Sequence, residues 1–225
     1  MPEGLLRGAM MKHGRFVLIM IWGLSSVVLT MGTEKVLPVM LSTVDRGTVV
    51  SPDGKWQLTV WGEKNESPWI MLESRDVQSK YRVQVWPIND SVYVLWAPDS
   101  QAFAFTDARF EDSYYLFVDH LRGYLGSEVT DLSSMLESHF SRFVGKRYEI
   151  LRWYVKPLLW VQKGVLLVGV DCDTAEKITP PPKQQPVQNW FRSYLVDVEQ
   201  RKVIDDLDEQ QTKSRYGIDL QKEKW

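Results

Sequence analysis

The feature of this sequence that most constrains its fold is a strand–turn–strand pattern that recurs along the chain. Residues 95–105 read Leu-Trp-Ala-Pro-Asp-Ser-Gln-Ala-Phe-Ala-Phe, and residues 49–60 read Val-Val-Ser-Pro-Asp-Gly-Lys-Trp-Gln-Leu-Thr-Val. Proline presets φ for the second position of a tight turn, aspartate bonds the backbone that follows it, and glycine tolerates the exit. The flanking residues alternate between apolar and polar or small side chains, which indicates half-buried strands.

A weaker third copy occupies residues 159–168, where Gln162 and Lys163 replace the Pro-Asp pair. The spacing of the first two copies is close to the length of a four-stranded propeller blade, roughly 40–45 residues. The third copy comes later because a helix-like insertion precedes it. This repetition predicts three related β units, which we call modules.

The motifs at residues 51–55 and 96–100 resemble the blade motif of TolB-type, WD-like propellers found in exported bacterial proteins. In that family the motif joins the first two strands of a blade, and most members serve as binding platforms. The resemblance implies a mainly β fold of propeller-like repeated antiparallel sheets, an incomplete propeller with one helical insertion. It implies no particular chemistry.

Three modules are too few to close a propeller, which typically has four to eight blades. Three arrangements therefore remain open. The modules could form an open stack of small sheets, the terminal strands could build an irregular fourth blade, or the chain could close by pairing with a second copy.

The same patterns place the remaining elements of a β repeat domain that spans residues 33–208. Apolar residues 36–44 predict an entering strand, and helical spacing of apolar residues predicts a helical insertion at about 127–144. Residues 179–186 are proline-rich and predict an extended, exposed loop. The predicted strands lie near 48–51, 56–62, 69–73 and 81–86, then 92–96, 101–107 and 113–120, then 148–155, 158–162, 165–171 and 192–199.

The two ends of the chain differ from the repeat domain. Basic residues precede an uncharged apolar run at 16–32, which is typical of a secretory signal, so residues 1–32 are a signal peptide or an uncleaved membrane anchor. Met1, Met10 and Met11 are alternative starts. In either case we expect the body of the chain outside the cytoplasm, periplasmic or secreted. Residues 209–225 form a polar tail, either a short solvated helix or a disordered segment.

The aromatic content is high, with ten Trp and nine Tyr among 225 residues. Large rings commonly fill the space between packed sheets. An alternative is a groove lined by Trp that binds a sugar or a peptide. Its candidate ligand-binding residues are four Trp residues that lie outside the three turn copies: Trp69, Trp86, Trp153 and Trp190.

The sequence offers little for catalysis. His139 falls on the apolar face of the predicted helix, and Asp119 and His120 point to opposite faces of a strand. Cys172 lies between Asp171 and Asp173, which disfavour a thiolate. No spacing suggests a metal site, no phosphate-binding or hydrolase motif occurs, and we expect no cofactor. A net charge of −2 gives no reason to expect nucleic acid as a partner.

These observations favour a non-enzymatic envelope protein, exported or tethered to the membrane through residues 16–32, that serves as a protein-interaction platform. The alternative is a periplasmic protein that binds or processes carbohydrate or peptide through its Trp-lined loops. A third possibility is an assembly factor held at the membrane by one helix. The sequence identifies neither the envelope partner nor the oligomeric state, and it does not decide whether an enzymatic activity exists.

Overall fold

The computed structural model describes residues 36–42, 44, 47–62, 67–78, 81–89, 91–110, 113–121, 127–178 and 187–223. These residues all belong to one compact unit. The predicted signal or anchor at 1–32 and the predicted proline-rich loop at 179–186 lie outside the described residues.

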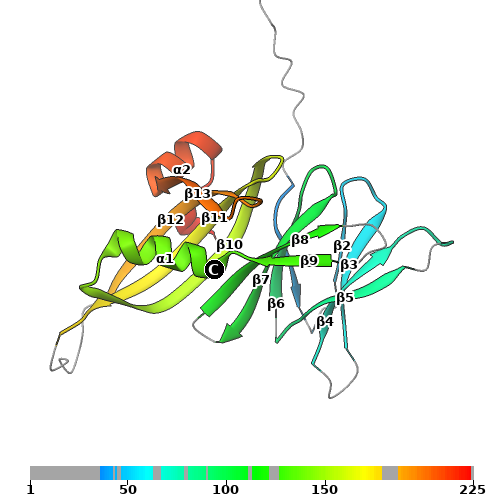
Figure 1. Ribbon diagram of the computed structural model, residues 1–225, viewed down its shortest axis with the longest axis horizontal. Helices are drawn as coiled ribbons and strands as arrows, with labels where there is room; N and C mark the ends of the chain where they lie inside the picture. Colours follow the sequence, from blue (N-terminus) through cyan, green and yellow to red (C-terminus); the bar gives the residue numbers. More distant parts are fainter. Residues whose placement is uncertain are drawn as a thin grey trace, which may run out of the picture. The chain divides into compact units, whose positions relative to one another are not determined.

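The described chain is mainly β and contains three successive four-stranded antiparallel modules (Figure 1). The first consists of β2 (Thr48–Val50), β3 (Trp56–Trp61), β4 (Trp69–Ser74) and β5 (Arg82–Pro87). The second consists of β6 (Ser91–Trp96), β7 (Ala102–Phe110), β8 (Ser113–Leu121) and β9 (Ser127–Asp131). The third consists of β10 (Tyr148–Gln162), β11 (Val165–Glu176), β12 (Val187–Asp197) and β13 (Lys202–Asp208).

The first module is a separate sheet, whereas the second and third share one nine-stranded sheet. A short parallel pairing of β8 with β10 joins them, and the entering strand β1 (Val39–Ser42) pairs with β6 at one edge. The prediction of a mainly β fold of antiparallel sheets is confirmed. The described strands close no propeller, because β1 and β13 remain as the edges of the larger sheet.

The break predicted between residues 155 and 158 is wrong, because β10 runs without interruption through Pro157. The register against β11 shifts between Pro157 and Leu159. A bulge lets a strand accept a residue that cannot donate a backbone hydrogen bond, so the strand continues past the proline.

Apolar residues on both faces of the second module hold the three modules together. One face packs on the first module and the other on the third, because alternate residues of β6 and β7 point to opposite sides. The first interface includes Leu58, Val60, Ile70, Leu72, Val92, Val94, Trp96, Phe103, Phe105 and Phe117. The second includes Leu95, Ala104, Leu116, Val118, Trp160, Leu166, Val168, Val170, Tyr194 and Val196.

The first module lacks the buried residue pair that the second and third modules each present to the module before them. Trp96 pairs with Phe103, and Trp160 with Leu166, across the strands that flank their turns, and these buried pairs face the preceding module. The corresponding pair in the first module is Val50 with Gln57, and Val50 is 41% exposed. A more polar outer face is what a terminal repeat needs for solubility.

The predicted polar tail covers the outer face of the third module. It contains α2 (Glu209–Tyr216), which Asp208 caps, and the 3-10 turn η2 (Leu220–Lys222). Leu220 is fully buried against Leu158 and Leu167. The tail is therefore helical and partly packed in the described region rather than simply solvated.

The predicted helical insertion begins later than its apolar spacing indicated. Residues 127–131, including Val129, pair with β8 as strand β9, and α1 spans Ser133–Val144. Leu136 and Phe140 are buried between the second and third modules. Pairing with β8 outweighed the helical spacing at Val129, because a strand beside an existing edge gains a ladder of backbone hydrogen bonds.

Candidate functional site

The turns that link the first two strands of the modules share one construction. Gly54 N donates to Ser51 O, and Ser100 N donates to Ala97 O, both over 2.9 Å. Gly54, Ser100 and Gly164 all have positive φ, at 73°, 57° and 72°. The third turn thus keeps the left-handed position although it lacks the Pro-Asp pair.

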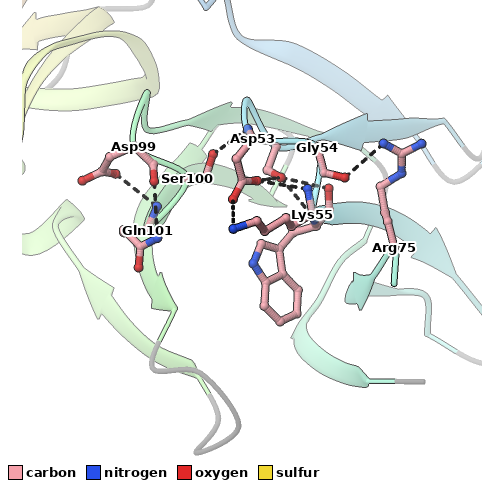
Figure 2. A network of polar contacts seen from close by, with 9 residues as sticks. Asp53, Gly54, Lys55, Arg75, Asp99, Ser100 and Gln101 are labelled. Carbon is pink, nitrogen blue, oxygen red and sulfur yellow. Dashed lines mark hydrogen bonds and ion pairs between the residues drawn. The ribbon is translucent and has the colours of Figure 1, made fainter. Parts of the chain in front are cut away.

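The predicted role of the two aspartates as turn formers is confirmed. Asp53 Oδ1 accepts from the Ser51 hydroxyl over 2.7 Å and from Lys55 N over 3.1 Å, and Asp99 Oδ1 accepts from Gln101 N over 3.1 Å (Figure 2). Burial acts to raise the pKa of Asp53, but the Ser51 hydroxyl, the Lys55 amide and the Lys55 charge outweigh it and lower that pKa. The carboxylate form is therefore the one that the turn stabilises.

Turns of neighbouring modules also contact each other. Asp53 N donates to the Ser100 hydroxyl over 3.0 Å, as Figure 2 shows, and Lys163 Nζ lies 3.7 Å from Asp99 Oδ2. Arg75 donates to Gly54 O over 3.2 Å and holds the first turn from its other side. We call the end of the molecule that carries residues 51–55, 97–101 and 162–164 the turn end.

A cleft of about 380 Å³ opens at the turn end between the second and third modules. Leu121 N donates to Gln101 O, and Val198 N donates to Gly164 O, so both walls are tied to the turns. His120 comes from β8, and Glu128 and Thr130 come from β9. Val198, Glu199 and Arg201 come from the turn that joins β12 to β13.

The base and the rim of this cleft differ in character. Thr130 and Val198 are 7% and 1% exposed and form the base. His120 is half-buried, and Glu128, Glu199 and Arg201 are exposed at the rim. The lining therefore offers a hydroxyl and charges of both signs, a set suited to binding a polar molecule.

The structure does not gather the four predicted Trp ligands into one groove. Trp69 faces away from the second module beside Trp61 and Pro87. Trp86 packs on Phe117 at 4.4 Å between ring centroids and donates to Asp107 Oδ2.

The other two predicted Trp ligands lie in the third module. Trp153 is 4% exposed and contacts Phe140 of α1. Trp190 donates to the Thr174 hydroxyl and lies edge-on to Phe143. The second module separates these two rings from Trp69 and Trp86.

Cys172 and His139, two of the side chains considered for catalysis, are packed against neighbouring residues. Cys172 is fully buried, and burial, followed by the charges of Asp173 and Asp171, raises the pKa of its thiol. His139 Nε2 lies 3.6 Å from Asp206 Oδ2, and its ring meets the edge of Tyr194. Within the described ranges no group of His, Cys, Asp or Glu is arranged to hold a metal ion.

A polar cluster across β10, β11 and β12 is held together by contacts among its own members. Arg152 binds both oxygens of Asp171 and lies 3.1 Å from Asp173 Oδ2, and Asn189 donates to both aspartates. Burial raises the pKa of Asp171 above its usual value, although Asn189 and Arg152 oppose that effect. The Asp-Cys-Asp segment that the sequence singled out is thus a structural ion-pair cluster.

The residues of the cleft were not foreseen as a site. Residues 127–131 were predicted as the start of the helical insertion, and Glu199 and Arg201 lie about 70 residues further along the chain. No local motif connects the two segments. The positive φ of Arg201, 50°, would have been the one local sign, and it is visible only in the structure.

Among the residues that the structure describes, no helix is long and apolar enough to cross a membrane, and the predicted anchor at 16–32 lies outside them. No protein-family model matches the chain, and no curated protein is similar to it in sequence.

Proposed function

We propose that this chain is a non-enzymatic protein of the cell envelope, exported or tethered through residues 16–32, that binds a partner protein. The observation that carries this proposal is the uncharged, exposed edge strand β1. The basic and apolar N-terminus and the resemblance of the turn motifs to TolB-type propellers support the same reading.

Strand β1 reads Val-Met-Leu-Ser and pairs, among the described strands, only with β6. Leu37, Val39 and Met40 are 64%, 44% and 57% exposed. An open strand edge presents backbone donors and acceptors to any extended chain that approaches it. The partner is accordingly an extended segment of another protein that adds beside β1.

The other edge of the nine-stranded sheet contrasts with β1. Strand β13 carries Lys202, Asp205, Asp206 and Asp208 among its seven residues. Charged side chains on an edge strand discourage the addition of another strand. The chain thus guards one edge and leaves the other accessible, which favours β1 as the contact strand.

A photo-reactive amino acid placed at Met40 of the full chain, expressed in intact cells, tests the proposal. We expect a discrete cross-linked envelope protein, with no such product from the same probe at Val77, which is 90% exposed in the first module. In a second arm, the probe is placed at Val39. Its cross-linked product should be lost when the chain also carries Met40→Lys and kept when the chain also carries Val77→Lys. Identical products from positions 40 and 77, or no product at either, would contradict the proposal.

A second candidate function is carbohydrate binding, which one observation favours. Trp61 and Trp69 lie opposite each other on the outer face of the first module, and Arg82 lies 5.1 Å from the Trp61 ring. Glu73 accepts from Gln57 and pairs with Arg82 on the same face. Aromatic rings beside hydrogen-bonding side chains suit a sugar ring, so loss of binding to a glycan array in Trp61→Ala would support this candidate.

A further inference from the structure

The cleft at the turn end is built by the packing of two modules, so its geometry is held by the core. Its walls come from β8 and β9 on one side and from the turn between β12 and β13 on the other. Its base, Thr130 and Val198, belongs to the buried part of the molecule. A volume of about 380 Å³ falls in the range of sites for small molecules.

Glu199 and Arg201, which carry opposite charges at the rim, are not paired with each other. Within the described chain, the side chains of His120, Glu199 and Arg201 make no hydrogen bond or ion pair, although carboxylates and a guanidinium line the same cleft. A guanidinium binds a carboxylate through two parallel hydrogen bonds, and a carboxylate binds an ammonium group. The rim therefore carries the complements of both a carboxylate and an ammonium group.

The backbone at Arg201 supplies an independent observation. Its φ is 50°, in the left-handed region that is strained for a residue with a side chain and that glycine adopts freely. Arg201 occurs in a tight turn where glycine or asparagine would be the unstrained choice. Backbone strain of this kind is retained where the side chain has a use.

We infer that this cleft binds a small zwitterion, a free amino acid or a dipeptide, with Arg201 on the ligand carboxylate and Glu199 on its ammonium group. Thr130 supplies a hydroxyl at the base. This site is separate from the β1 edge and does not depend on the partner proposed there.

Titration calorimetry of the purified full chain tests the inference with four free amino acids, alanine, leucine, lysine and glutamate, and with the dipeptide alanylalanine. N-acetylalanine, which lacks the ammonium group, and alaninamide, which lacks the carboxylate, are the matched controls. We expect at least one zwitterion to bind with a Kd below about 1 mM and both blocked compounds to bind at least about tenfold more weakly. Comparing the free amino acids with the dipeptide shows which of these two classes of zwitterion the cleft prefers.

Substitutions assign the roles of the residues. Arg201→Gly should weaken binding at least about tenfold while leaving thermal stability equal to or above that of the wild type, because glycine relieves the strained φ. A purely structural role for Arg201 predicts the opposite change in stability. Glu199→Gln should weaken binding, and Lys146→Gln, two residues before the start of β10 and not in the lining of the cleft, should not. Absence of binding for every zwitterion up to about 10 mM, or equal binding of the blocked compounds, would overturn the inference.

Discussion

The indole N–H of Trp160 donates a hydrogen bond to the backbone carbonyl of Leu95, 3.2 Å away, and so ties the third module to the second. Trp96, the next residue after Leu95 in β6, makes the corresponding bond to Val49 of the first module over 3.4 Å. Strand β6 thus donates to the module before it and accepts from the module after it. The same kind of joint, an indole N–H on a backbone carbonyl of the preceding module, therefore occurs at both interfaces.

Trp96→Phe and Trp160→Phe should each lower the free energy of unfolding by about 1–3 kcal/mol, since each removes a buried hydrogen bond and leaves a carbonyl without that donor. The matched control is Trp153→Phe. Trp153 is equally buried, but its indole nitrogen has no hydrogen-bond partner. Urea titration of the three variants should rank Trp153→Phe as the mildest, and equal losses in all three would contradict this account of the joints.

Ser100→Ala should destabilise the protein more than Ser100→Gly. Both substitutions remove the hydroxyl that accepts from Asp53 N, but only glycine relieves the positive φ of 57°. That relief offsets about 1 kcal/mol of the loss. Thermal melting of the two variants measures the difference, and the reverse order would show that the left-handed backbone is not strained here.

Asp53 should make part of the stability dependent on pH. Its native pKa is lowered, so its contribution is present above the ordinary pKa of the unfolded chain and is lost as the pH falls through the native value. Asp53→Asn keeps the shape of the side chain without the titration. The difference in unfolding free energy between wild type and variant should therefore shrink between about pH 5 and about pH 2. A constant difference across that range would exclude this role.

Leu220→Ala should cost about 2 kcal/mol or more, because the side chain is fully buried on the outer face of the third module. Leu151→Ala is the control, since Leu151 is 44% exposed and should change stability by less than about 0.5 kcal/mol. Size-exclusion chromatography of Leu220→Ala adds a second measurement. Self-association of this variant would indicate that the tail normally covers a surface that can bind a second copy of the chain. Unchanged stability would show that packing of the tail is dispensable.

Cys172 should be inert in the folded protein. It is fully buried, burial and the two adjacent aspartates disfavour the thiolate, and it is the single cysteine of the chain, so any thiol signal is its own. Reaction with a thiol-specific chromophore should be absent in native buffer and should rise with urea in step with global unfolding. Fast labelling of the native protein would contradict the buried position.

Most of the strands lie where the sequence predicts them, and the boundaries that differ do so for identifiable reasons. The predicted strands of the first module agree with β2, β3, β4 and β5, because their alternation and turns are local signals. The start of α1 and the continuity of β10 were predicted wrongly, because pairing with β8 and a bulge at Pro157 override local preference. The predicted Trp ligands were chosen by residue type, and residue type does not report which face of a sheet a ring occupies.

The turns follow from local sequence, since Pro, Asp, Gly and Ser constrain only their own few residues of backbone. Long-range packing sets how the modules meet and places the tail over the third module. It also brings residues 120, 128 and 130 into one cleft with residues 198, 199 and 201. Such contacts join segments far apart in the chain. Their energies arise from burial and packing between modules, for which no local pattern exists.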